Sequence, residues 1–189
     1  MAIGSGDFEL TMDELRVVAH YVLESAEGVL PVFEDAHPGD PRPRAAINAA
    51  QEFVNGARRT RLQRIASLDA HRAAKEATTE AARLAARAAG DAASAAYLHP
   101  IAKATQVGHI LRAAASAARV GELNAGDDFA VGLRLIEEAR QRAVPVLIDV
   151  LNRYPPAPTG KSRAAQLMTI LDTSLRIPRR TEGQPQHRG

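Results

Sequence analysis

The feature that most constrains this chain is its alanine-rich middle, residues 58–120, in which alanines are interspersed with charged residues and single leucines. Alanine has the highest helix propensity of all residues and is depleted in strands. No segment of the chain shows the alternation of β-branched and polar residues that is typical of a half-buried strand. We therefore expect an all-α protein.

The bulk composition indicates a single globular domain. The chain has 189 residues, of which 46% are hydrophobic and 24% charged, and this length is enough to bury a core. It has no cysteine, which excludes disulfides, thiolate nucleophiles and thiolate metal ligands. Residues 1–10 lack the apolar segment of a signal peptide, and no apolar run approaches the roughly 18 residues of a membrane span. We expect a cytoplasmic protein without membrane association.

Proline, glycine and capping residues divide the chain into about six expected helices. The first begins at Thr11, which forms a capping box with Glu14. Pro100 and Pro145 lie within two of the helices, and we expect a kink at each because proline lacks a backbone donor and crowds the preceding turn. The expected helices cover residues 11–33, 43–56, 58–90, 91–120, 127–154 and 161–175.

These helices are expected to form one bundle, residues 11–175, between a flexible N-terminus, residues 1–10, and a disordered basic tail, residues 176–189. The tail carries four arginines and one glutamate, so the chain's net charge of +2 leaves the bundle close to neutral. The one basic run inside the bundle, residues 58–64, has no interleaved aromatic residue for base stacking. We interpret it as a solvated helix start and do not expect a nucleic-acid partner.

The core is expected where large apolar residues and alanines recur at helical spacing. Alanines in residues 77–92 form a small-residue ridge that favours close helix packing. In residues 62–75, by contrast, an apolar stripe of Leu62, Ile65 and Leu68 gives way to charged residues. The expected core residues are Val22, Val29, Phe33, Ile47, Phe53, Ala85, Ala92, Phe129, Leu133, Leu147 and Leu171.

Catalytic signatures are not found. The chain has no phosphate-binding loop, dinucleotide-binding glycine motif, nucleophile elbow or zinc-protease histidine pair. His20 and Glu24 lie one helical turn apart, but such pairs are common on helix surfaces. We expect no enzymatic activity, no cofactor and no metal.

The most unusual stretch is residues 97–111, where polar residues gather around Pro100. His99, Lys103 and Gln106 share one helical face, and His109 flanks it. One interpretation is that these four side chains line a concave binding surface at the proline kink. The other is that they satisfy one another as structural polar groups. We carry the four forward as candidate binding residues.

Four segments resemble a known family. They are residues 14–19, 26–34, 40–47 with the pattern D-x-R-P-R-x-A-I, and 81–90, which end in A-A-R-A-A-G. Over residues 10–154 the chain resembles an Ala-rich all-α family of immunity proteins of bacterial polymorphic toxin systems. It departs from the commoner family pattern at Asp91, where that pattern has histidine, so a role of that histidine does not carry over.

The resemblance implies a non-enzymatic binding protein that neutralises a cognate bacterial toxin by occluding its active site. The alternative is a small-molecule-binding or sequestering bundle with a pocket at the Pro100 kink. An enzyme acting through His99 or His109 is not expected, because the sequence shows no nucleophile that could pair with either histidine.

Overall fold

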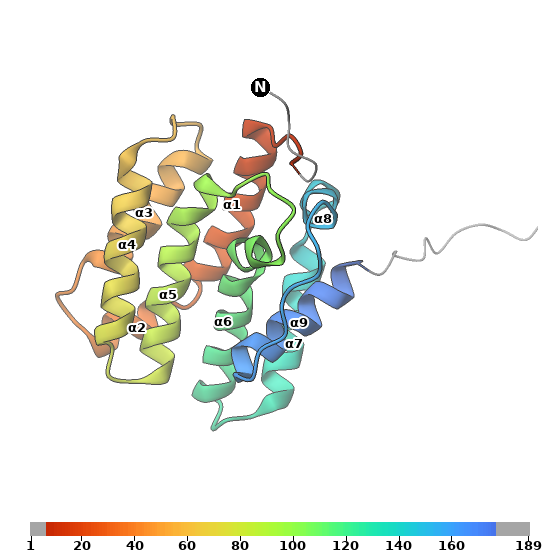
Figure 1. Ribbon diagram of the computed structural model, residues 1–189. Helices are drawn as coiled ribbons and strands as arrows, with labels where there is room; N and C mark the ends of the chain where they lie inside the picture. The colour runs from red at the N-terminus through yellow and green to blue at the C-terminus, as the bar shows by residue number, and fades with distance from the viewer. Residues whose placement is uncertain (1–6, 177–189) are drawn as a thin grey trace, which may run out of the picture.

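The computed structural model describes residues 7–176, and this part of the chain folds into helices without a β-strand (Figure 1). The expected all-α class is confirmed. An isolated β-bridge pairs Asp7 with Ile101. The described residues form nine α-helices and two short 3₁₀ helices: α1 Met12–Glu27, α2 Leu30–Ala36, α3 Arg42–Val54, α4 Arg61–Glu76, α5 Glu80–Ser94, η1 Ala95–Tyr97, η2 Ala104–Val107, α6 Gly108–Asn124, α7 Phe129–Arg142, α8 Pro145–Asn152 and α9 Arg163–Arg176.

The count of about six helices was wrong because three of the expected helices, residues 11–33, 58–90 and 127–154, are each divided in two. The kink expected at Pro145 is absent, because this proline starts a new helix. Helix α7 stops at Arg142, and α8 begins at Pro145. Val144 between them is extended (φ −79°, ψ 158°), which is the conformation that a following proline favours. At the first turn of a helix proline loses no intrahelical hydrogen bond, so Pro145 starts α8 without strain.

Pro100 lies in a linker between α5 and α6, and the kink expected there is also absent. The Pro100 carbonyl accepts a hydrogen bond from the Phe8 amide (3.1 Å), and the Tyr154 hydroxyl donates to the His99 carbonyl (2.9 Å). The Phe8 and Tyr154 rings meet edge to face at 4.9 Å. The linker is therefore held against the first described residues and the segment after α8.

Threonines mark the starts of three helices. The capping box predicted at Thr11 is confirmed, with the Glu14 amide 3.1 Å from the Thr11 hydroxyl. Thr79 caps α5 by accepting the Ala82 amide (3.1 Å), and Thr60 caps α4. The cap at Thr79 divides the expected helix of residues 58–90 into α4 and α5, because Thr79 adopts an extended backbone there.

The helices pack in two groups around α1. Helices α3, α4 and α5 lie on one side of Figure 1 and α6, α7 and α9 on the other, with α1 contacting α3, α5 and α6. Alanines such as Ala85 and Ala88 are fully buried at these crossings, as the small-residue ridge predicted. None of the helices in residues 7–176 is long and apolar enough to cross a membrane.

The predicted core is confirmed except on α7. Phe129 and Leu133 are about half exposed on the outer side of that helix, and the Arg163 guanidinium covers the Phe129 ring at 4.4 Å. The other predicted core residues are buried: Val22, Val29, Phe33, Ile47, Phe53, Ala85, Ala92, Leu147 and Leu171.

Helix α4 turns its larger apolar side chains outward. Leu62, Ile65 and Leu68 are 48%, 51% and 53% exposed. The buried face of α4 consists of small or polar residues instead, namely Gln63, Ala66, Ser67, Ala70, Ala73 and Ala74. Because α4 packs closely against α3 and α5, the alanine face fits the interior better than the leucine face.

The predicted termini are described only in part. Of the N-terminus expected to be flexible, residues 1–10, the structure describes 7–10. Of the tail expected to be disordered, residues 176–189, it describes Arg176, the last residue of α9, and the rest lies outside the described residues.

Candidate functional site

The four residues singled out in the sequence do not all converge. His99 and Lys103 are exposed in the linker, and the Gln106 side-chain oxygen accepts the His99 amide (3.1 Å). His109 lies in the first turn of α6, and its Nδ1 is 3.4 Å from the Ser94 hydroxyl at the end of α5. The structure thus brings His99 and Gln106 together and places His109 elsewhere. Their role as a binding surface stays a prediction.

A buried ion pair joins α5 to α6 near His109. Asp91 is fully buried in the last turn of α5, and Arg112 of α6 binds it through two contacts, Nε to Oδ2 at 2.8 Å and Nη2 to Oδ1 at 2.5 Å. A bidentate arginine–carboxylate pair fixes the direction of both side chains. The exposed edge of the Arg112 guanidinium is therefore held in place between the two helices.

His71 of α4 lies against the same pair. Its Nε2 is 3.6 Å from Asp91 Oδ1, and its ring rests on Gly90, where a Cβ atom would lie 2.9 Å from the imidazole. Burial lowers the pKa of His71, and the nearby Arg112 lowers it further, although Asp91 opposes this. Burial lowers the pKa of His109 in the same way. Both imidazoles are therefore neutral near pH 7.

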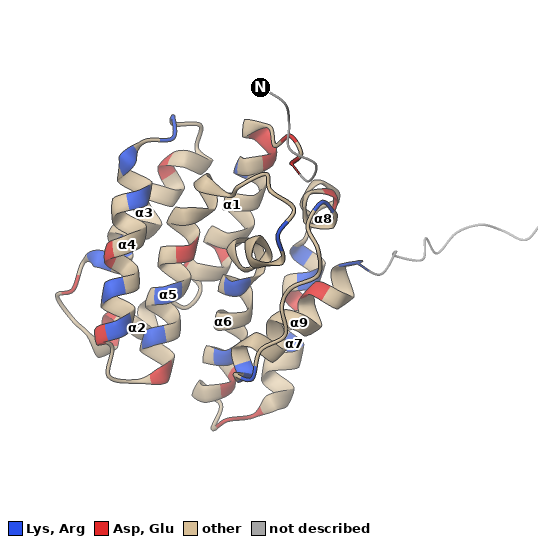
Figure 2. Ribbon diagram, in the orientation of Figure 1, with Lys and Arg blue, Asp and Glu red and all other residues tan. Residues whose placement is uncertain are grey.

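Beside this cluster lies a cationic cavity of about 370 Å³ between α4, α5 and α6, lined by His71, Ala74, Lys75, Arg83, Arg87 and Arg112. Arg112 is neutralised by Asp91. Among the described residues, Lys75, Arg83 and Arg87 have no ion-pair partner. Figure 2 shows the basic segments along α4 and α5. Desolvation and the neighbouring Arg112 lower the pKa of Arg87. Three cations without an acidic partner among the described residues therefore line one cavity.

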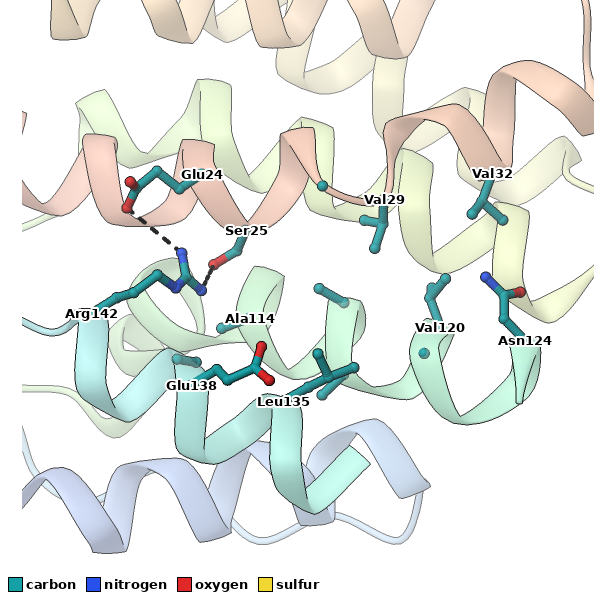
Figure 3. A pocket seen from close by; sticks show the side chains of 15 residues that line it. Glu24, Ser25, Val29, Val32, Ala114, Val120, Asn124, Leu135, Glu138 and Arg142 are labelled. Carbon is teal, nitrogen blue, oxygen red and sulfur yellow. Dashed lines mark hydrogen bonds and ion pairs between the residues drawn. The ribbon is translucent and has the colours of Figure 1, made fainter. Parts of the chain in front are cut away.

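A second hollow, between α1, α6 and α7, has a different chemistry (Figure 3). This groove of about 340 Å³ is lined largely by alanines and by apolar residues such as Val29 and Leu135. At its mouth Arg142 contacts Glu24 (3.6 Å) and the Ser25 hydroxyl (3.1 Å). The charges at this groove are thus internally paired, in contrast to those of the cationic cavity.

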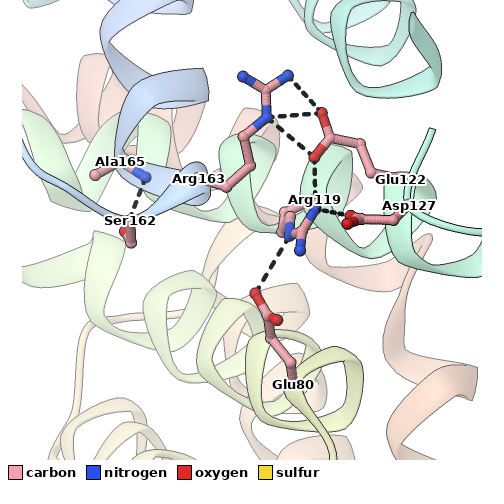
Figure 4. Close-up of polar contacts among 7 residues, drawn as sticks. All are labelled: Glu80, Arg119, Glu122, Asp127, Ser162, Arg163 and Ala165. Carbon is pink, nitrogen blue, oxygen red and sulfur yellow. Dashed lines mark hydrogen bonds and ion pairs between the residues drawn. The ribbon is translucent and has the colours of Figure 1, made fainter. Parts of the chain in front are cut away.

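The largest polar network within residues 7–176 is built around Glu122 and joins α5, α6, α9 and the turn before α7 (Figure 4). Glu122 of α6 is fully buried and accepts hydrogen bonds from Arg163 of α9 (2.7 and 3.0 Å) and Arg119 (3.0 Å). Arg119 also contacts Glu80 at the start of α5 (3.2 Å) and Asp127 before α7. Every charged group in this network has an opposite partner, so we interpret it as structural.

Neither the Asp91–Arg112 pair nor the Glu122 network was predicted from the sequence. A usable signal was present: Asp91 is an acid on the alanine ridge of α5, between Ala88 and Ala92. An acid on a face that otherwise carries alanine needs a buried partner. Which arginine supplies it depends on helix packing, which the sequence pattern does not specify.

Comparison with known proteins gives one family match. A family model described as "Imm-5 like putative immunity protein" matches residues 9–145. The matched region runs from just before α1 to the first residue of α8, so it includes the cationic cavity and Glu122 but not Arg163. No curated protein and no solved structure shows a significant match to the chain.

Proposed function

We propose that the chain, which belongs to the Imm-5 like family of putative immunity proteins, neutralises a bacterial protein toxin by binding it. The observation that carries this proposal is the family match over residues 9–145. That region contains helices α1–α7, the cationic cavity and the groove of Figure 3, so a function shared by the family is expected to reside there.

The chemistry of the cationic cavity supports binding over catalysis. His71 and Asp91 are near each other, as in many hydrolases, but both Asp91 oxygens already accept hydrogen bonds from Arg112. A carboxylate whose two oxygens are held by one guanidinium keeps its position and acts as a structural partner. The Asp91–Arg112 pair therefore serves as a fixed wall of the cavity, and the positive charge offered to another molecule comes from Lys75, Arg83 and Arg87.

The proposal extends to the kind of toxin, the compartment and the stoichiometry of binding. We propose that the toxin belongs to a bacterial polymorphic toxin system and that the encounter occurs in the cytoplasm. The bundle would act stoichiometrically, with one chain covering the functional surface of one toxin molecule. A helical bundle with a close-packed alanine interior is suited to this role because its surface changes little on binding.

The test is to co-express the chain with a toxin-like protein encoded beside its gene and to score bacterial growth. The chain should restore growth and purify with the toxin as a one-to-one complex. An unrelated toxin is the control, and the chain should not protect against it. A folded chain that leaves the neighbouring toxin active contradicts the proposal, and so does full protection at far less than one chain per toxin, which indicates catalysis.

A further inference from the structure

The outer side of α4 and α5 carries two features that a binding partner could cover: cations without an acidic partner and exposed apolar side chains. The first is the set of cations without an acidic partner among the described residues, Lys75, Arg83 and Arg87, at the rim of a cavity of about 370 Å³. Like charges in one cavity repel one another, and this repulsion is relieved when an anion binds between them. The cavity is thus poised for an anionic group.

The second feature is the exposed apolar stripe of α4. Leu62, Ile65 and Leu68 follow one another at three-residue steps and are each about half exposed. Each three-residue step turns the stripe by about 60° around α4, so it does not run straight along the helix. Leu68 precedes Lys75 by seven residues, or about two turns, so Leu68 lies on the same side of α4 as the rim of the cavity. A row of large apolar side chains next to a polar rim is typical of protein–protein interfaces.

We infer that this surface, the α4–α5 face made by Ile65, Leu68, Lys75, Arg83 and Arg87, docks an acidic protein surface. A carboxylate of the partner occupies the cavity between Arg83, Arg87 and Arg112, and apolar side chains beside it pack on the stripe. The inference rests on the proposed function, because it takes the toxin as the partner and assigns it an acidic patch.

The arginine geometry suits a carboxylate. Arg112 uses two of its five N–H donors on Asp91, so three remain for a ligand. Arg83 and Arg87 lie one helical turn apart on α5 and can approach the same anion from one side. Because Asp91 fixes the Arg112 guanidinium through two hydrogen bonds, Arg112 is already ordered in the free protein and loses little side-chain entropy when an anion binds.

The residues around these cations favour a protein as the binding partner over a nucleic acid. Binding of single-stranded nucleic acid relies on aromatic rings that stack on bases. Tyr97 lies near this face, but the Arg59 and Arg64 guanidinium groups lie over its ring at 5.1 and 4.8 Å. The exposed groups next to the cations are aliphatic, and these contact apolar protein side chains better than they contact phosphates.

The first arm of the test uses fluorescein-labelled poly-L-glutamate as an acidic polypeptide, followed by fluorescence anisotropy. The double variant Arg83→Gln/Arg87→Gln should bind it about tenfold more weakly than the wild type. The matched control is Arg134→Gln/Lys161→Gln, which removes the same charge outside the α4–α5 face and should change affinity less than about twofold. Equal losses in the two variants, no binding by the wild type, or displacement of the peptide by short double-stranded DNA at a lower charge concentration would each overturn the inference.

The second arm uses the toxin from the co-expression test. The same double variant should bind the toxin about tenfold more weakly and keep its melting midpoint, because Arg83 and Arg87 lose no partner among the described residues. A carbodiimide, which links amines to carboxylates directly, should join Lys75 to an acidic residue of the toxin. If the wild-type chain binds no toxin, the proposed function fails. If it binds and the double variant binds equally well, the inference fails and the proposed function stands.

Discussion

Replacing Glu122 with alanine tests whether the network of Figure 4 holds the bundle together. The Glu122 carboxylate is fully buried and is the only carboxylate that Arg163 contacts among the described residues. Arg119 would keep Glu80 and Asp127 as partners. The substitution therefore leaves one largely buried guanidinium, that of Arg163, without a counter-charge.

The expected loss of stability follows from that imbalance. Removing one member of a buried ion pair costs about 3–5 kcal/mol because the other charge stays desolvated. The Arg163 side chain is 19% exposed and also contacts the Phe129 ring, so it can recover part of its solvation. We expect the lower end, about 3 kcal/mol, which corresponds to a fall in melting midpoint of about 6–12 °C for a chain of this size.

Thermal and urea unfolding followed by circular dichroism measure this effect. The control is Glu138→Ala, which removes a carboxylate that is 53% exposed and contacts Arg134 at 3.2 Å, and should cost less than about 1 kcal/mol. The double variant Glu122→Ala/Arg163→Ala should be more stable than the sum of the single losses predicts. If Glu122→Ala melts like the control, the network does not stabilise the fold and the reasoning is wrong.

Three further predictions concern the interior, the pH dependence and the α4–α5 face. Ala85→Leu should overpack the fully buried crossing of α5 and lower stability by about 1–3 kcal/mol in urea unfolding, and a wild-type midpoint would contradict close packing there. The pKa values of His71 and His109 are lowered in the folded chain from the usual 6.5, so near and below that pH the unfolded chain binds more protons than the folded chain, and the free energy of unfolding decreases as the pH is lowered. His71→Gln should make this decrease shallower between about pH 7 and pH 5 in urea unfolding, and an unchanged slope would refute the assignment. Ile65→Ser should weaken toxin binding without moving the melting midpoint, whereas Ile170→Ser, on α9, should leave toxin affinity unchanged; equal toxin affinities for the two variants would contradict a contact at Ile65.

The class of fold and most of the core could be predicted from the sequence because they depend on local signals. Helix propensity, the cap at Thr11 and the burial of Phe33 and Phe53 all follow from patterns within a few residues of each position. The positions of Pro100 and Pro145 were also informative. The choice between a kink and a break was not, because it depends on whether neighbouring segments, such as Phe8 beside Pro100, supply hydrogen bonds to an interrupted backbone.

The candidate site could not be predicted because its parts come from different helices. Arg112 follows Asp91 by 21 positions, and only the packing of α6 on α5 brings the two together. The outward orientation of Leu68 could not be predicted from the sequence for a related reason. Helix α4 has two candidate stripes, one of leucines and isoleucine and one of alanines, and periodicity alone does not say which stripe faces the interior.

The alanine interior has a consequence for how such a protein could diversify. Alanine loses no side-chain rotamer freedom on burial, so the contacts of Ala85 and Ala88 form without the ordering that longer side chains require. The residues that would recognise a partner, such as Arg87 and Ile65, contribute little to those contacts. Substitutions on the outside could therefore alter which toxin is bound in a few steps, while the interior keeps the same backbone in each descendant.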